Sequence, residues 1–334
     1  MSNPFIIQKK GKLDLNDLYI NSDVYLYPYA RNAFLEILKV MSIKTIYLPA
    51  FICRDMLAPI NVLDIKYFFY DVDKKLNPLL NDIECDAILT VNYFGFAGDF
   101  SPFIKYKEKY GSLIIEDNAH GFLSRDSSGT LLGTRGDVGL LSIRKTIFLP
   151  NGAALLINDS GLKKRAFQSA EIKESFEDIN YSKKLNLKKF LVSKYLGMII
   201  LLLRRLVRYI QTGDSIPPVD KLSETQMPDN KYLTPLLNSS TLNIDMSSEV
   251  IRRQELYQLI EGYADSFDIK PIFKLNDFSV PFEFSFIDDG KSDKFEKYLF
   301  QKGFFILPWP DLADEVLNHC PNTYKNIKVV PFLW

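Results

Sequence analysis

Reactive side chains follow two of the apolar runs that we predict to be strands. Asp117 and His120 come shortly after the apolar sequence SLII, and Ser142 and Lys145 come shortly after VGLL. In parallel α/β sheets, ligands bind beyond the carboxyl ends of the strands. A carboxylate, an imidazole, a hydroxyl and an amine are therefore expected to meet at one edge of the sheet.

The same groups are what the cofactor pyridoxal phosphate (PLP) requires. A lysine amine forms a Schiff base with its aldehyde, a carboxylate keeps its ring nitrogen protonated, and a hydroxyl with backbone amides at a helix N-terminus binds its phosphate. The sequence YARNAF (29–34) opens the first predicted helix and can supply those amides. Asp117 or Lys145 alone is typical of an ordinary turn, so the prediction depends on the combination.

Short apolar segments alternate with longer helical patterns over the first half of the chain. Segment 99–111 has the pattern of a helix, with Ser101 as its N-cap, Pro102 at its first position and Gly111 as its end. This β-α-β alternation predicts an α/β fold, with a mostly parallel sheet covered by helices on both faces. The predicted strands are 45–51, 65–71, 86–94, 112–118, 138–143 and 153–159.

Three longer runs occur in a characteristic order. They are VNYFGFAGDFSPFIKYKEKYGSLIIEDNAHGF (91–122), GTRGDVGLLS (133–142) and NGAALLIND (151–159). They resemble, in turn, the E-D-x-A-[H/Q] segment, the G-x-x-G-D-x-G-x-x-S run and the glycine-rich strand of the DegT/StrS-type aminotransferases. The segment 29–53 upstream and the sequences RRQELYQLIEGY and GFFILPWPDL downstream fit the same order. The chain is thus similar to a divergent member of this PLP-dependent (sugar) aminotransferase family.

The resemblance implies the fold and its organisation. The family has the aspartate aminotransferase fold, PLP fold type I, with a three-layer, mostly parallel sheet and a smaller C-terminal α+β domain. We expect a large PLP-binding domain over residues 1–240, in which 160–240 is a divergent helical segment. The small C-terminal domain is expected over 241–334, with a helix at 247–267 that leads into short strands.

The resemblance also implies residue roles. Asp117 is expected to pair with the pyridine nitrogen, and His120 to lie near the phenolic oxygen or over the face of the ring. Lys145 is expected to bind the cofactor covalently, and Ser142 to bind its phosphate. No metal ion is expected. The rest of the phosphate cup would be the backbone around Ala30, Arg31 and Asn32.

The spacing of the lysine departs from the family. The usual pattern is S-x-x-x-x-K, but five steps from Ser142 lead to Ile147. Counted back from Gly152 and Ala153, which match the family's glycine pair, Lys145 lies at the expected distance. We therefore assign Lys145 and infer that two residues are missing between serine and lysine. If this assignment is wrong, the chain is a relative without the lysine.

Two other departures concern the surroundings of the cofactor. Ala30 replaces a glycine of the phosphate cup, and Cys53 stands where many members have an aromatic residue that stacks on the ring. Arg144 is expected either to add charge near the phosphate or to point into solvent, and Trp309 either to contact substrate or to pack in the core. The aromatic face could instead come from Phe51, Tyr93, Phe94 or His120.

From the resemblance follows the expected reaction. The protein would transfer an amino group from an amino acid, usually glutamate, to a keto sugar, usually linked to a nucleotide. Two alternatives stay open: a lysine-independent PLP enzyme such as a sugar dehydratase, in which His120 or another base handles the proton, and a catalytically silent relative. The sugar, its nucleotide and the position of amination cannot be read from the sequence.

Composition favours small-molecule substrates. The 334 residues carry 41 basic and 41 acidic side chains, so no global field favours nucleic acid. Three scattered cysteines give neither a disulfide framework nor a zinc motif, and the first residues do not have the pattern of a signal peptide, so we expect a cytoplasmic protein.

The most hydrophobic segment is 190–210. Its uninterrupted apolar part has nine residues (195–203), too few to span about 30 Å of hydrocarbon. A buried or subunit-interface helix is favoured over a helix that lies on a membrane surface through its arginines. The resemblance implies a homodimer, and this segment is our candidate for part of its interface.

Overall fold

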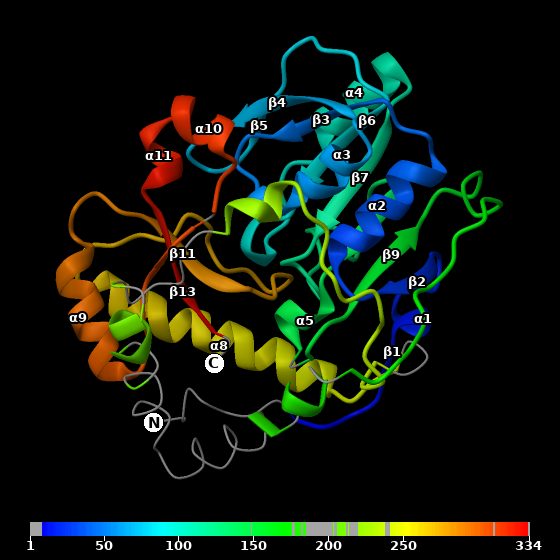
Figure 1. The fold of residues 1–334 in the computed structure, drawn as a ribbon. Helices are drawn as coiled ribbons and strands as arrows, with labels where there is room; N and C mark the ends of the chain where they lie inside the picture. The colour runs from blue at the N-terminus through cyan, green and yellow to red at the C-terminus, as the bar shows by residue number, and fades with distance from the viewer. Residues whose placement is uncertain are drawn as a thin grey trace.

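The computed structural model describes residues 9–147, 149–175, 178–181, 183–184, 203, 206–211, 213, 220–237, 241–309 and 311–332. In this part of the chain, the central sheet has eight strands in the order β2-β9-β8-β7-β6-β3-β4-β5 (Figure 1). The five strands from β8 to β4 run parallel, while β9, β2 and β5 join by antiparallel pairing. The strands are β2 (Asp23–Tyr27), β3 (Thr45–Pro49), β4 (Lys66–Val72), β5 (Pro78–Leu79), β6 (Ala87–Val91), β7 (Leu113–Asn118), β8 (Val138–Leu141) and β9 (Ala153–Ile157). The predicted mostly parallel α/β sheet is confirmed.

Two hydrophobic cores lie against this sheet, because its strands are apolar on both faces. In β8, Leu140 packs in one core and Leu141 in the other. In β9, Leu155 and Leu156 divide in the same way. Neighbouring side chains of a strand point to opposite faces, so a strand that is covered on both sides is a continuous apolar run.

Helices connect and cover the strands. The predicted helix at 99–111 is α4 (Ser101–Tyr110), and Gly111 ends it in a left-handed conformation with a φ of 70°. Ser101 is not the N-cap as expected: Phe100 has that position, Pro102 is second, and Asp99 Oδ1 accepts the Ser101 N–H over 3.0 Å. The other helices of this half are α1 (Leu15–Leu18), α2 (Ala30–Val40), α3 (Ala58–Val62) and α5 (Ile143–Thr146), with short 3-10 turns η1 (Arg54–Met56) and η2 (Tyr93–Gly95).

The C-terminal part contains a three-stranded antiparallel sheet, in the order β11-β13-β12. Its strands are β11 (Glu283–Ile287), β12 (Leu307–Pro308) and β13 (Ile327–Pro331), and its helices are α8 (Met246–Asp265), α9 (Ser292–Lys302), α10 (Asp314–His319) and α11 (Asn322–Lys325). A small sheet of β1 (Leu13–Asp14) and β10 (Thr241–Leu242) joins the beginning of the described chain to this part. The domain boundary at residue 240 stays a prediction.

Much of the expected divergent segment 160–240 lies outside the described residues. The described part of this segment includes the 3-10 turn η3 (Lys221–Glu224). Of the segment 190–210, only 203 and 206–210 are described, and their apolar side chains are exposed. In the described residues, no helix has both the length and the hydrophobicity that crossing a membrane requires. The interface role of 190–210 stays a prediction.

The glycine run before β8 allows a close backbone approach. A Cβ atom at Gly139 would lie 2.0 Å from the carbonyl oxygen of Gly133, and one at Gly136 would lie 2.9 Å from the carbonyl oxygen of Ile114. Backbone atoms cannot move aside as the end of a flexible side chain can. The run GTRGDVG therefore lets its own loop fold tightly against β7 and β8, and β8 leads directly to Ser142 and Lys145.

Candidate active site

A pocket opens at the carboxyl ends of the parallel strands. Its walls are the segments that follow β3, β6, β7 and β8, together with the start of α2 and Trp309. Of the predicted site residues, the pocket contains Asp117, His120, Ser142, Lys145, Ala30 and Arg31. Asn32 does not line the pocket that the described residues form, although its Oδ1 atom is buried without a hydrogen-bond partner among them.

Asp117 lies at the end of β7, between β6 and β8. It is 6% exposed, and its Oδ1 atom accepts the Ala119 N–H over 2.9 Å. Burial raises the pKa of Asp117, while the nearby charge of Lys145 opposes this shift. A cationic partner is therefore favoured beside this carboxylate, because a buried charge costs free energy unless an opposite charge compensates it.

Lys145 is carried by the single turn of α5, directly after β8. Its backbone N–H donates to the Ser142 carbonyl over 3.0 Å, and its Nζ atom lies 3.1 Å from His120 Nε2. Ser142 is buried in the same wall. The strand end therefore brings an amine, a hydroxyl and an imidazole within one short stretch of the pocket.

His120 is held between aromatic rings. The Phe282 ring stacks on it with centroids 4.7 Å apart and planes at 5°, and the Phe94 ring lies nearly parallel with a centroid distance of 6.0 Å. Burial, and then the charge of Lys145, hold the pKa of His120 well below its usual range, so the ring is neutral at pH 7. The Phe94 N–H points at Nδ1 over 3.4 Å, and Nε2 is the ring nitrogen that faces Lys145.

Positive side chains lie at the end of the pocket where α2 begins. Arg31 pairs with Asp55 over 3.5 Å, and the Arg144 guanidinium lies 5.3 Å from the Tyr29 ring centre. The Arg144 Nε atom is buried and has no hydrogen-bond partner among the described residues. Arg144 lines the pocket wall and is partly buried, and its expected place near the phosphate stays a prediction.

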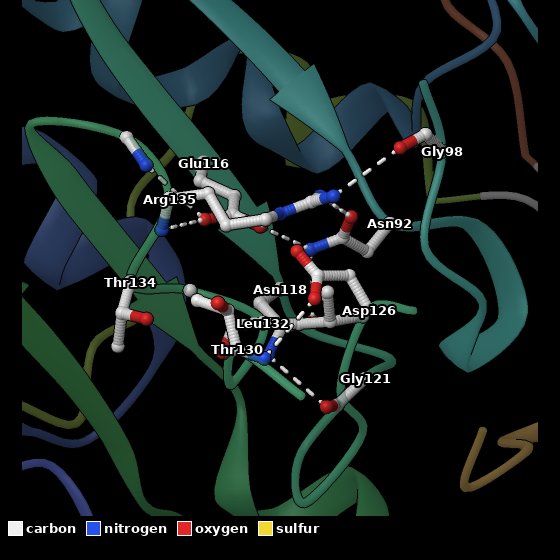
Figure 2. A network of polar contacts seen from close by, with 12 residues as sticks. Asn92, Gly98, Glu116, Asn118, Gly121, Asp126, Thr130, Leu132, Thr134 and Arg135 are labelled. Carbon is white, nitrogen blue, oxygen red and sulfur yellow. Dashed lines mark hydrogen bonds and ion pairs between the residues drawn. The ribbon is translucent and has the colours of Figure 1, made fainter. Parts of the chain in front are cut away.

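Glu116 and Asn92 belong to a separate network, shown in Figure 2. Arg135 donates through Nε to Glu116 Oε1 over 2.8 Å and through Nη2 to Asn92 Oδ1 over 2.6 Å. Asn92 Nδ2 also donates to Glu116 and to Asn118. Alternate residues of a strand face opposite sides of the sheet, so Glu116 and Asn118 are together while Asp117 points to the pocket. This network is structural.

The other predicted aromatic residues have mixed positions. Phe51, Tyr93 and Trp309 line the pocket, whereas Phe94 lies behind His120. The Cys53 thiol also lines it, and burial raises the pKa of that thiol to about 12. The pocket therefore has aromatic walls without the aromatic residue that the family places at Cys53.

Glu283 is a buried acid that the sequence analysis missed. It begins β11, it is 5% exposed, and its Oε2 atom has no hydrogen-bond partner among the described residues. Burial raises the pKa of Glu283 from 4.5 to about 8, with the charges of Lys145 and Arg253 opposing. An acid within the apolar sequence SVPFEFSFI was the available signal, since charged residues in buried strands are rare.

We expect Glu283→Gln to remove a pH dependence of stability. Between pH 4.5 and about 8, folded Glu283 keeps a proton that the unfolded chain has lost, so the free energy of unfolding falls as pH rises. Glutamine cannot titrate, so the variant should melt higher than the wild type near pH 8, by on the order of a few degrees. Thermal unfolding at both ends of this range checks it: an equal difference at pH 5 and pH 8 contradicts the assignment.

Comparisons with known proteins test the family and the fold. Residues 58–187 match the model of the DegT/DnrJ/EryC1/StrS aminotransferase family. This confirms the predicted family resemblance. The matched segment contains Asp117, His120, Ser142 and Lys145, and it ends before Trp309. No curated protein sequence matches the chain.

Solved structures with a similar fold include aminotransferases and a sugar dehydratase. Helicobacter pylori PseC, an aminotransferase involved in the biosynthesis of pseudoaminic acid, is 13% identical with a TM-score of 0.60, over 95% of this chain and 83% of its own. A DegT DnrJ EryC1 StrS aminotransferase from Brucella abortus is 15% identical with a TM-score of 0.55, over 95% and 82%. GDP-4-keto-6-deoxymannose-3-dehydratase (ColD) is 16% identical with a TM-score of 0.54, over 95% and 85%. The fold is thus that of the PLP fold type I aminotransferases.

Proposed function

We propose that the protein is a PLP-dependent aminotransferase that moves an amino group from an amino acid, usually glutamate in this family, to a nucleotide-linked keto sugar. One observation carries the proposal: Lys145 and Asp117 line one pocket, at the ends of adjacent parallel strands, with the N-terminus of α2. This is the donor and acceptor set that the chemistry of PLP requires.

The residues present fit the cofactor at both ends. Asp117 would hold the ring nitrogen, because its buried carboxylate favours a cationic partner. Ser142, Arg144 and the first amides of α2 would hold the phosphate. A buried donor without an acceptor costs free energy, so the Arg144 Nε atom is a place where a phosphate oxygen would be stabilised.

Bound PLP would supply an electron sink for the carbanion formed at the donor's α carbon. Lys145 Nζ would take the α proton as a general base and return it to the carbon that receives it. Asp117 would keep a proton at the ring nitrogen throughout. The uncharged imidazole of His120 would orient the Lys145 amine through the 3.1 Å contact without adding a second positive charge. The donor leaves as a keto acid, and the acceptor gains the amino group.

The matched family and structures of the same fold support the proposed substrate class. PseC acts in pseudoaminic acid biosynthesis, and CalS13 from Micromonospora echinospora is described as a sugar aminotransferase. Trp309 lines the pocket and meets the His120 ring edge-on at 5.4 Å, so it is the side chain that we place against the sugar. The family resemblance also supports a homodimer, which stays a prediction. The cysteine pattern supports a cytoplasmic location, which stays a prediction as well.

A second candidate is a lysine-independent sugar dehydratase. His120 Nε2 lies where the Lys145 amine would act, so an imidazole could handle the proton in its place. ColD, which has the same fold, is a dehydratase. This candidate predicts turnover without Lys145, whereas the aminotransferase does not.

The first test is an absorbance spectrum of the purified protein with added PLP, before and after borohydride reduction, followed by peptide mass mapping. We expect reduction to fix PLP on Lys145. Bound PLP that is never trapped on Lys145 would rule out the aminotransferase mechanism and favour the dehydratase. If no PLP binds, a catalytically silent relative becomes the favoured function class.

A further inference from the structure

A fully buried arginine lies behind the site, outside the pocket lining. Arg253 is on α8, which runs past α5 and β11 in Figure 1, and it is 0% exposed. Its Nε atom donates to Glu249 Oε1 over 2.7 Å. Its two other nitrogens, Nη1 and Nη2, donate to backbone carbonyl groups of segments that border the active site.

Those nitrogens bind the backbone on two sides of the site. Nη2 donates to the Thr146 carbonyl over 3.1 Å, and Nη1 donates to the Pro281 carbonyl over 3.0 Å and the Phe282 carbonyl over 3.3 Å. Thr146 is the residue after Lys145 in the single turn of α5. A four-residue helix has little stability of its own, so the hydrogen bond from the guanidinium helps to fix its last residue.

The second side carries the ring behind His120. Phe282 stacks on the imidazole at 4.7 Å, and Lys145 Nζ lies 5.9 Å from the centre of the same ring. The Phe282 N–H donates to the Phe94 carbonyl over 2.8 Å, so its backbone is bound in two directions. The rigid, planar guanidinium of Arg253 therefore connects the turn that carries Lys145 to the segment whose Phe282 ring supports His120.

We propose that Arg253 is a positioning residue that fixes the Lys145 amine relative to the His120 imidazole. The inference rests on the proposed function only in giving Lys145 its chemical role. Arginine suits the task because its donors lie in a fixed fork, which a lysine ammonium on a flexible stem does not reproduce. The buried charge is balanced by Glu249, which also binds Arg252 over 2.8 and 2.7 Å.

Arg252 provides a matched control. It shares Glu249 with Arg253, and its hydrogen bonds among the described residues go to Glu249 and not to the backbone of the active site. The full-length variants to compare are Arg253→Met, Arg253→Lys and Arg252→Met. Arg252→Met should lower the melting temperature and leave the chemistry of Lys145 unchanged. Arg253→Lys keeps the charge, and it gives the answer if Arg253→Met does not fold.

Two measurements report on Lys145 itself. The first is the rate at which borohydride traps PLP on Lys145, which we expect to fall roughly tenfold to a hundredfold in Arg253→Met, because small displacements of a reacting group cost that much. The second needs no cofactor: acetylation of the Lys145 amine as a function of pH, followed by mass spectrometry of its peptide. We expect a several-fold faster reaction and a displaced pH profile in both Arg253 variants.

The outcomes are separable. The inference would be overturned if folded Arg253→Met or Arg253→Lys showed the trapping rate and the acetylation profile of the wild type. It would also be overturned if Arg252→Met showed the slower trapping and the altered acetylation that we expect of the Arg253 variants. If the wild-type protein never binds PLP, the proposed function fails, but the acetylation profiles still decide the role of Arg253.

Discussion

Lys145→Ala is expected to lower transamination roughly 10⁴-fold, the upper end of what a general base contributes, because the same amine also binds the cofactor covalently. The variant should still bind PLP, since the groups expected around the ring and phosphate are unchanged. Borohydride should leave no PLP attached to its peptide. Single-turnover formation of keto acid from glutamate measures the loss.

Two controls make this result specific. Lys105→Ala removes an exposed lysine of α4 and should leave turnover unchanged. A small primary amine added to Lys145→Ala should restore part of the proton transfer if the variant is folded and only the base is missing. Full activity in Lys145→Ala would contradict the assignment.

The same variant decides between the two candidate functions. A dehydratase that uses His120 should retain water elimination in Lys145→Ala and lose it in His120→Asn. An aminotransferase should lose its reaction in Lys145→Ala, with a smaller loss in His120→Asn, since His120 then orients the amine only. The 3.1 Å contact between the two side chains is what makes both readings possible.

The sheet could be predicted because its strands are buried on both faces. Such strands are continuous apolar runs, and Leu140 and Leu141 show why: the two neighbours pack in different cores. The start of α4 could not be predicted as well. Asp99, two residues before Ser101, provides the acceptor that was expected from Ser101. Local capping alternatives of this kind compete within a few tenths of a kcal/mol to about 1 kcal/mol, too little to read from sequence.

Some residues of the candidate site could likewise be predicted from the sequence, and others could not. Asp117, His120, Ser142 and Lys145 could be proposed because each lies at or just after the end of a strand, and these strand ends meet at one edge. The role of Arg253 was not predicted, because its partners at 146 and 281 are far away in the sequence and are carbonyl groups, which every residue has. Asp55, which lines the pocket and pairs with Arg31, was not predicted either, because no motif in the sequence around it marks it. Asn32 does not line the pocket that the described residues form, and its place in the phosphate cup stays a prediction.

Asp117→Asn is expected to reduce turnover by roughly 10²–10³-fold, comparable to the loss of one preorganised electrostatic contact in other active sites. The amide has the same shape and its oxygen can still accept the Ala119 N–H, so the fold should be retained. It cannot supply the negative charge that keeps a proton on the ring nitrogen, so PLP should bind with a changed absorbance and react slowly.

Glu116→Gln is the matched control, one residue earlier in β7. It weakens the buried network with Arg135, so it should cost stability, by about 3–5 kcal/mol if the pair is fully broken. Because this side chain faces away from the pocket, kcat of the folded variant should stay near that of the wild type. The decisive comparison is kcat at a temperature where both variants are folded. A loss in Glu116→Gln as large as in Asp117→Asn would mean that strand integrity, and not the carboxylate at the pocket, limits the reaction.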